Sequence, residues 1–301
     1  MSELTWGPIL AGYLFLGGLA GGAYMVGALT DLFKKEKYAV LSKSGILASF
    51  VSIVLGLVLL VFDLKRFEVA PLVILNAYRR FPGSIMAVGT WIITGFTLVS
   101  LVTVVLWYLD GHRLARKIVE VIGVILGLAT AAYTGILLSF ARGVPFWNSG
   151  FLPWLFVLSG LLTGLAISIL LIPIAAVFMP KVFGDFKSTW NATPEYLELV
   201  GYSDDLGIPM IFIETAVMLL YLVTTPSTGI LWSGSGISLY FYAYLLLALL
   251  MPLALTYYNQ KLTTAGRHKT VVYLTLLTTV LVLVGGFLLR YVVLIGGQMI
   301  F

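Results

Sequence analysis

The sequence contains no cysteine, only two histidines and only 10% charged residues among its 301 positions. Without cysteine, the protein can form no disulfide, hold no iron–sulfur cluster and attach no thioether-linked haem. Soluble domains carry roughly 25% charged and about 45–50% apolar residues, whereas 60% of this chain is hydrophobic. We therefore exclude a soluble globular protein and infer that lipid surrounds most of the molecule.

The two histidines also argue against a haem held inside the protein. Membrane anchors that carry haem hold it between histidines borne on helices. Here His112 and His268 adjoin Arg113 and Arg267 in basic segments between apolar runs, where we expect them to be solvated. The net charge of +5 comes mainly from such segments, so it reports membrane orientation and not nucleic-acid binding. Any electron carrier must be supplied from outside the chain.

Eight apolar runs are long enough to cross a bilayer, which takes about 20 residues of helix. We predict an all-α integral membrane protein, a single transmembrane domain over residues 1–301, with both termini outside. Twelve of the 18 Lys and Arg residues lie in the odd-numbered loops, which the positive-inside rule places in the cytoplasm. The predicted spans are 8–32, 43–63, 82–109, 117–140, 152–178, 208–225, 237–258 and 271–295.

Two loops stand out from the rest. The second loop is basic although it is predicted to lie outside, and either docks a partner or is simply a solvated loop. Residues 179–207 form the only long connection, a predicted cytoplasmic loop between helices five and six. Within it, Thr193 and Pro194 favour the start of a short surface helix over 194–200.

Glycine and proline predict how the helices pack. Glycines four residues apart, such as Gly18 with Gly22 and Gly160 with Gly164, place two small residues on one helix face and favour close helix contacts. Pro252 lies within the seventh span and predicts a kink there.

Several polar residues lie toward the predicted outer side of the membrane. Polar side chains are costly in lipid, so each is expected to have a structural or functional role. Together they would suit a quinone, whose head needs donors for two carbonyl oxygens and a route for two protons. The alternative is that Asp63 and Arg66 pair at a helix end and that the tyrosines belong to an interfacial belt. The residues concerned are Tyr13, Asp63, Arg66, Tyr133, Arg142 and Arg290.

Glu214 is the deepest carboxyl group, about 9 Å from the cytoplasmic end of its predicted helix. It is either a proton-relay station, reached from Asp204 and Asp205, or a neutral acid hydrogen-bonded within the bundle. Asp31 and Asp110 end helices at the cytoplasmic face, where we expect ordinary solvation.

Four segments, in order along nearly the whole chain, resemble the NrfD-like family, the membrane subunits of polysulfide reductase. The first reads Y-L-F-L-G-G-L-A-G-G, and the others centre on D-L-K-R, on Y-T-G followed by P-F-W-N and L-P-W-L-F, and on L-R-Y. They occupy residues 13–22, residues 63–66 with 82–84, residues 133–135 with 145–148 and 152–156, and residues 289–291 with 297–298.

The resemblance implies a subunit with eight to ten helices, built around four-helix bundles, in a respiratory oxidoreductase complex of the cell (cytoplasmic or inner) membrane. It implies a non-covalently bound quinone, expected to be of menaquinone type, with no haem or iron–sulfur cluster in this chain. The implied partners, on the outer face, are a ferredoxin-like iron–sulfur subunit and a molybdopterin subunit with molybdenum or tungsten. Terminal chemistry of the polysulfide or sulfur reductase type would reside on those partners.

Site residues carry over by position. Tyr13 stands where the family has a quinone-contacting histidine, and Tyr133 matches its quinone-contacting tyrosine, with Thr134 beside it. Tyr13 and Tyr133 would hold the quinone head, Asp63 would receive a proton, Arg66 or Arg290 would set the local potential, and Glu214 could add a proton route from inside. This sequence departs from the family pattern at Tyr13 itself, at Leu10 in place of an asparagine, and at Lys65 and Phe67 in the Asp-Leu-Gly-Arg-Pro run.

Two other functions fit the composition. A proton-coupled solute transporter would also use intramembrane carboxyl groups and glycine-rich helices, although it would usually show interrupted helices in two related halves. A passive membrane anchor would bind no quinone, and its tyrosines would only pack.

Overall fold

The computed structural model describes residues 6–34, 38–63, 76, 78–109, 112–141, 143–179, 183 and 193–299. Every regular element within these ranges is helical. Eight helical segments there are long and apolar enough to cross a membrane. The all-α fold and the eight spans predicted from the sequence are confirmed.

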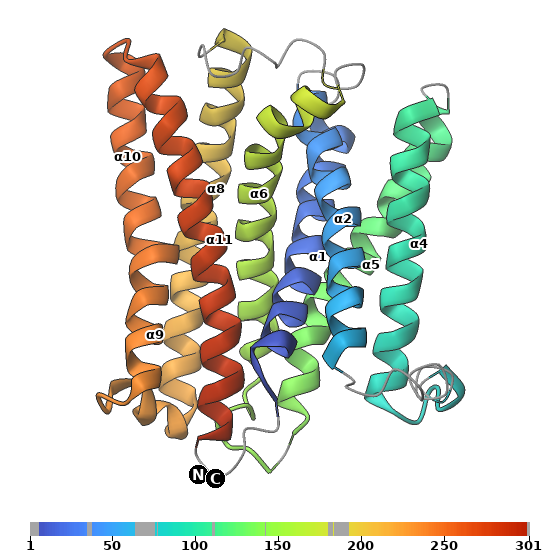
Figure 1. Cartoon of the computed structure of the whole chain (residues 1–301), viewed down its shortest axis with the longest axis vertical. Coiled ribbons are helices and arrows are strands. Elements are labelled where there is room, and N and C mark those ends of the chain that lie inside the picture. Colours follow the sequence, from blue (N-terminus) through green and yellow to red (C-terminus); the bar gives the residue numbers. More distant parts are fainter. Residues whose placement is uncertain are drawn as a thin grey trace.

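The first four spans form one bundle (Figure 1). They are α1 (Pro8–Lys34), α2 (Ala39–Asp63), α4 (Ile85–Leu109) and α5 (Arg113–Ser139). The most apolar stretch of α1 is 72% buried within the protein, whereas that of α4 is only 22% buried. α1 is therefore a central helix of the molecule, and α4 lies at its edge with most of its surface toward lipid.

The last four spans form a second bundle beside the first (Figure 1). They are α6 (Leu152–Phe178), α8 (Pro194–Thr224), the helix made up of α9 (Gly236–Tyr244), η4 (Leu245–Leu250) and α10 (Met251–Thr264), and α11 (His268–Gln298). The short helix η3 (Pro226–Trp232) joins α8 to α9.

Glycines allow α1 to join the two bundles. A Cβ atom added to Gly22 would lie 1.8 Å from the carbonyl oxygen of Gly160 in α6, and one added to Gly21 would lie 2.3 Å from that of Gly127 in α5. Only a residue without a side chain permits such backbone contact. The close packing expected from the glycine spacing is confirmed.

The sixth span begins earlier than the sequence predicted. α8 starts at Pro194, so 194–207 is neither part of a loop nor a separate surface helix. Tyr196, Leu199 and Val200 are buried against the rest of the bundle, and their spacing puts all three on one helix face. Glu195, Glu198 and the two aspartates lower the apolar content of this segment, which hid its continuity with the span.

The seventh span is one continuous helix, Gly236–Thr264, that changes its hydrogen-bond pattern next to Pro252. A π-helical segment, Leu245–Leu250, directly precedes Met251–Thr264, in which Pro252 lies in the first turn. Proline has no N–H to donate to the preceding turn, and the wider i→i+5 pattern is one way in which a helix accommodates that loss. The irregularity near Pro252 is thus a π segment, and the kink itself stays a prediction.

Trp6 and Gln298, close to the two ends of the described chain, meet at one face of the protein, which we call the terminal face. The Trp6 N–H donates to Oε1 of Gln298 over 2.9 Å, and Nε2 of Gln298 donates to the Trp6 carbonyl over 3.0 Å. Trp147 stacks on Trp6 with ring centroids 5.2 Å apart and donates to the Val293 carbonyl over 2.7 Å. Trp6 and Gln298 therefore lie on the same side of the protein, and the location of the termini on the outer side of the membrane stays a prediction.

Candidate functional site

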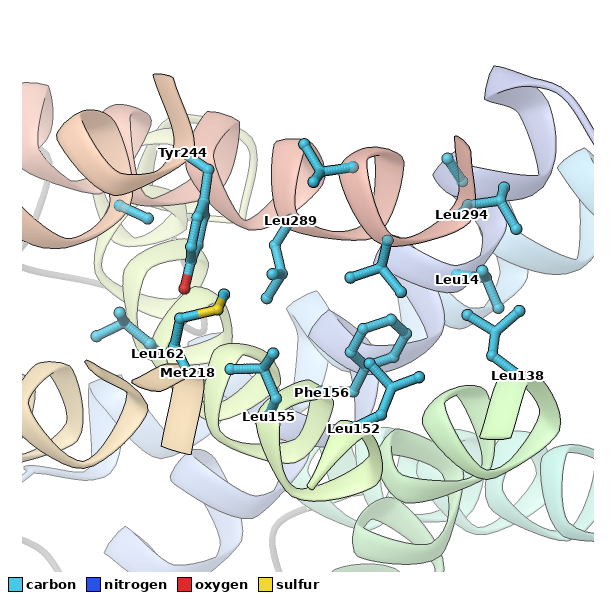
Figure 2. Close-up of a cluster of buried hydrophobic side chains, with 14 of the residues drawn as sticks. Leu14, Leu138, Leu152, Leu155, Phe156, Leu162, Met218, Tyr244, Leu289 and Leu294 are labelled. Carbon is cyan, nitrogen blue, oxygen red and sulfur yellow. The ribbon is translucent and has the colours of Figure 1, made fainter. Parts of the chain in front are cut away.

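A continuous apolar core joins the two bundles near the terminal face (Figure 2). It packs Leu14 of α1 and Leu138 of α5 together with Leu152 and Phe156 of α6 and Leu289 of α11. Two polar clusters lie within this apolar surround, on different sides of α1. Each one contains residues predicted to be functional.

The first cluster contains Tyr13 of α1 and Tyr133 of α5. Their side chains are only 5% and 7% exposed and lie within electrostatic range of each other. Neither phenol hydroxyl forms a hydrogen bond within the described part of the protein, and neither is among the fully buried atoms that lack a partner. Although the rings are buried, the two hydroxyls therefore keep some accessible surface and offer two unused donors in an apolar setting.

A glycine on the neighbouring helix α4 makes room for the Tyr133 ring. A Cβ atom on Gly89 would lie 1.8 Å from Cζ of Tyr133, so any larger residue there would displace the ring. Gly56 of α2 lies beside Tyr13, where a Cβ atom would make an ordinary contact of 3.8 Å with Cδ2. The position of Tyr133 therefore depends on the backbone of α4.

The structure describes Asp63 and Thr134, two of the other residues predicted for this pocket, and places them differently. Asp63, half-buried at the end of α2, follows Gly56 by seven residues, so it lies on the same helix face about 10 Å nearer the terminal face. Thr134 turns toward Gly17 and donates its hydroxyl to the Ala131 carbonyl over 2.8 Å, which leaves it no hydrogen to offer a ligand here. Arg66 and Arg142 lie outside the described residues.

Arg290 does not line this pocket, contrary to the prediction. Its side chain is 0% exposed, and its guanidinium donates to the Ser159 hydroxyl, to the Phe156 carbonyl over 3.1 Å and to the Gly286 carbonyl over 2.9 Å. It lies against Gly18, where a Cβ atom would come within 2.8 Å of Nη2. Counting residues predicted the depth of Arg290 along α11. It could not predict that the side chain lies on the face of α11 that packs against α6.

Arg290 instead belongs to a second cluster with Glu214 and Tyr244. Glu214 of α8 is buried and accepts a hydrogen bond from the Tyr244 hydroxyl over 3.0 Å at Oε1. Its Oε2 has no partner within the described residues, although Arg290 and Ser159 both interact with the carboxyl group. Figure 2 shows Tyr244 reaching from α9 toward Met218 of α8.

A third cluster of charged residues lies at the opposite end of the first bundle. Arg116 of α5 contacts Asp31 of α1 over 3.1 Å and Glu120 over 3.6 Å, and its guanidinium carbon lies 3.6 Å from the ring centroid of Trp107. Asp31 and Glu120 are buried. The prediction that Asp31 is simply solvated is wrong, because Arg116, in the first turn of α5, reaches across to pair with it.

A cavity of about 50 Å³, with a mainly apolar lining that also contains several polar side chains, lies within the second bundle, between α6, α8, α10 and α11. Its lining includes Asp204, Asn259 and several hydroxyl groups. Three apolar lining residues, Leu162, Ile211 and Val282, lie about one to two helical turns from members of the second cluster in their own helices. The cavity thus approaches Glu214 but is separated from it by an apolar layer.

Sequence reasoning missed several members of these clusters, namely Ser159, Tyr244, Glu120 and Asn259. Ser and Tyr occur widely in membrane helices as packing or interfacial residues, so neither type marks a site by itself. The charged Glu120 and the amide Asn259 could have been found, since each is a costly side chain within an apolar run.

Comparison with known proteins agrees with the resemblance in the sequence. The family model described as polysulphide reductase, NrfD, matches residues 1–301. The chain is 28% identical to the C subunit of polysulfide reductase from Wolinella succinogenes and 25% identical to a protein NrfD homolog of Haemophilus influenzae, in each case over 99% of this chain and 95% of the relative. This eight-span membrane protein therefore belongs to the NrfD family of polysulphide reductase membrane proteins.

Proposed function

We propose that the protein is the quinone-binding membrane subunit of a respiratory oxidoreductase complex. The observation that carries this proposal is the pair of buried phenols, Tyr13 and Tyr133, whose hydroxyl groups have no partner within the described residues. A quinone head presents two carbonyl oxygens to such donors, and its apolar tail suits the surrounding core. Membership of the family and the lack of cysteine for a redox group of its own support the same function.

The side chains divide the work by position. Tyr13 and Tyr133 would hold the head group and exclude water from it. Asp63, at the end of α2 nearer the terminal face, would take up a proton and pass it outward. A bound quinol would supply two electrons and two protons. Arg66 remains a candidate for tuning the local charge, whereas Arg290 would act on Glu214.

The partners follow from the name of a relative. A polysulfide reductase that has a C subunit has other subunits as well, and we propose that here they are a ferredoxin-like iron–sulfur subunit and a molybdopterin subunit. The iron–sulfur subunit would dock on the terminal face near the phenols, because electron transfer needs a short path. Arg79 and Arg80, both exposed, are candidates for contacting an acidic surface on it.

We also propose that Glu214 exchanges protons with the side opposite the terminal face. Its Oε2 has no partner within the described part of the protein, and the cavity of α6, α8, α10 and α11 approaches it from that side. The apolar layer of Leu162, Ile211 and Val282 would have to admit water for a proton to cross. Such a route would connect quinol chemistry to proton movement.

Quinone content tests the main proposal directly. The protein is purified from its native membrane, and extracted lipid is assayed for quinone by mass spectrometry. We expect quinone with the wild-type protein and at least a tenfold loss in the Tyr13→Phe, Tyr133→Phe double variant. Tyr196→Phe is a matched control. The Tyr196 hydroxyl is buried without a partner among the described residues, but Tyr196 lies in the first turn of α8, away from the terminal face.

The same preparation separates the alternatives. Copurification of iron–sulfur and molybdenum or tungsten subunits supports the complex. Equal quinone content in the wild type and the double variant would instead favour a passive anchor, and solute uptake by the isolated protein would favour a transporter.

A further inference from the structure

The cavity of the second bundle has an unusual chemical lining. Oxygen-bearing side chains reach it from three helices, and its lining, within the described residues, contains no Lys, Arg or His. The π segment Leu245–Leu250 ends beside it, and Pro252 lines it. Irregular helices of this kind occur often at functional sites and at polar cavities within membranes. The oxygen-bearing residues are Ser203, Asp204, Thr256, Asn259, Thr275, Thr278 and Thr279.

Asn259 presents its carbonyl oxygen as an unused acceptor. The Thr275 hydroxyl donates to the Val271 carbonyl over 2.9 Å, so its oxygen can only accept from Nδ2 of Asn259, 3.1 Å away. This fixes the orientation of the amide. Oδ1 is then the free end, and it has no partner among the described residues although Asn259 is only 1% exposed. An unsatisfied buried oxygen is costly.

The hydroxyl groups of the lining are acceptors as well. Ser203 donates its hydrogen to the Val200 carbonyl over 2.7 Å, and Thr279 donates to the Leu276 carbonyl over 2.8 Å. Their hydrogens are therefore used within their own helices, and only their lone pairs remain for a ligand. Thr256 alone among these hydroxyl groups has no hydrogen-bond partner in the described part of the structure.

A ligand of positive charge satisfies this lining better than water does. Most of the lining is apolar, and its polar groups offer mainly lone pairs, with Thr256 as the one hydroxyl group among the described lining residues that can also donate. Asp204 is the one ionisable side chain among the described residues that line the cavity, so one positive charge balances it and a divalent ion would leave an excess. Small hard cations prefer oxygen ligands such as carboxylate, amide and hydroxyl groups.

We propose that this cavity binds a sodium ion, held by the Asp204 carboxylate, Oδ1 of Asn259 and hydroxyl oxygens between α8, α10 and α11. The ion would join three helices of the second bundle close to the π segment of one of them. Asp204 is half-buried, which places the carboxylate at the entrance. Sodium binding at this place is independent of quinone binding in the first bundle.

Thermal unfolding of the purified full-length protein in detergent tests the proposal. NaCl is titrated against choline chloride and, separately, against KCl at constant ionic strength. A ligand that binds only the folded state raises Tm with its concentration, so we expect a saturable increase in Tm with sodium but not with choline or potassium. Equilibrium dialysis with radioactive sodium should find one ion per wild-type molecule.

Variants locate the ion. Asn259→Leu removes the amide oxygen at similar volume, and Asp204→Asn removes the charge. We expect each to weaken the apparent sodium affinity at least tenfold. Thr263→Val is the matched control, because Thr263 is exposed on the same helix and donates to the Asn259 backbone carbonyl. It should keep the wild-type response.

Two results would overturn the proposal. One is a wild-type protein that has the same Tm in sodium, potassium and choline and shows no saturable binding of radioactive sodium. The other is undiminished sodium affinity in both cavity variants. The wild-type measurements decide the matter even if a variant fails to fold.

Discussion

Tyr244 and Glu214 are joined by a hydrogen bond of 3.0 Å across two helices of the second bundle, with the phenol as donor and carboxylate Oε1 as acceptor. Only one of the two carboxyl oxygens is used in this way within the described residues. The other is available to carry or release a proton. Arg290 lies close enough to interact with the same carboxyl group.

Replacing Glu214 by Gln should separate electron transfer from proton movement. Glutamine keeps the size of the side chain and its hydrogen bond to Tyr244 but cannot ionise. In vesicles that contain the complete complex, we expect quinol turnover to persist while proton translocation falls to background. The measurement is the ratio of protons moved to quinol oxidised, and an unchanged ratio would reject the proposed route.

Replacing Tyr133 by Phe should slow quinol turnover about tenfold. One hydrogen bond contributes about 0.5–1.5 kcal/mol, and about 1.36 kcal/mol corresponds to a factor of ten in rate. The fold should survive, because the hydroxyl makes no hydrogen bond within the described residues. Steady-state kinetics of the complex checks the effect. Tyr196→Phe should leave kcat/KM at the wild-type value, and an equal loss in both variants would remove Tyr133 from the site.

Adding one methyl group to Gly22 should prevent normal assembly of the two bundles. A Cβ atom there would overlap the Gly160 backbone at 1.8 Å, and overpacking of this kind costs about 1–3 kcal/mol or more. Gly201→Ala is the control of opposite sign. Gly201 lies in α8 with open space around it, and alanine is about 1 kcal/mol more favourable than glycine in a helix. Thermal unfolding in detergent should therefore show a lower Tm for Gly22→Ala and an equal or higher Tm for Gly201→Ala.

Arg116→Gln should destabilise the first bundle more than Asp31→Asn does. Removing the arginine leaves two buried acidic residues, Asp31 and Glu120, without their shared cation, and breaking a buried ion pair costs about 3–5 kcal/mol. Removing Asp31 leaves the Arg116–Glu120 contact in place. Denaturation of the two purified variants gives the order of stability, and the reverse order would contradict this prediction.

Most of the fold could be predicted from hydropathy because each span has to satisfy its backbone within one apolar helix. The prediction failed at 194–207, where acidic residues on one face conceal a helix whose other face, with Tyr196 and Val200, is buried. Mean hydropathy averages over both faces of a helix, so it does not reveal a buried apolar face when the opposite face is charged.

The site was less accessible to sequence reasoning because it depends on which way each helix faces. The depth of Tyr13 and Tyr133 follows from counting residues, and the structure brings them together. Arg290 was assigned to the same pocket on depth alone, but its side chain faces α6. The partners of Glu214 were equally hidden, because Tyr244 and Ser159 come from distant parts of the sequence.

The glycine contacts of α1 also constrain how the protein is made. Gly21 and Gly22 emerge from the ribosome well before their partners Gly127 and Gly160, which follow more than 100 residues later. During synthesis, the glycine face of α1 must therefore contact lipid or the insertion machinery until α5 and α6 have entered the bilayer. A nascent polypeptide that stalls before α6 would leave this face without its packing partner, and membrane proteases could recognise it as incomplete.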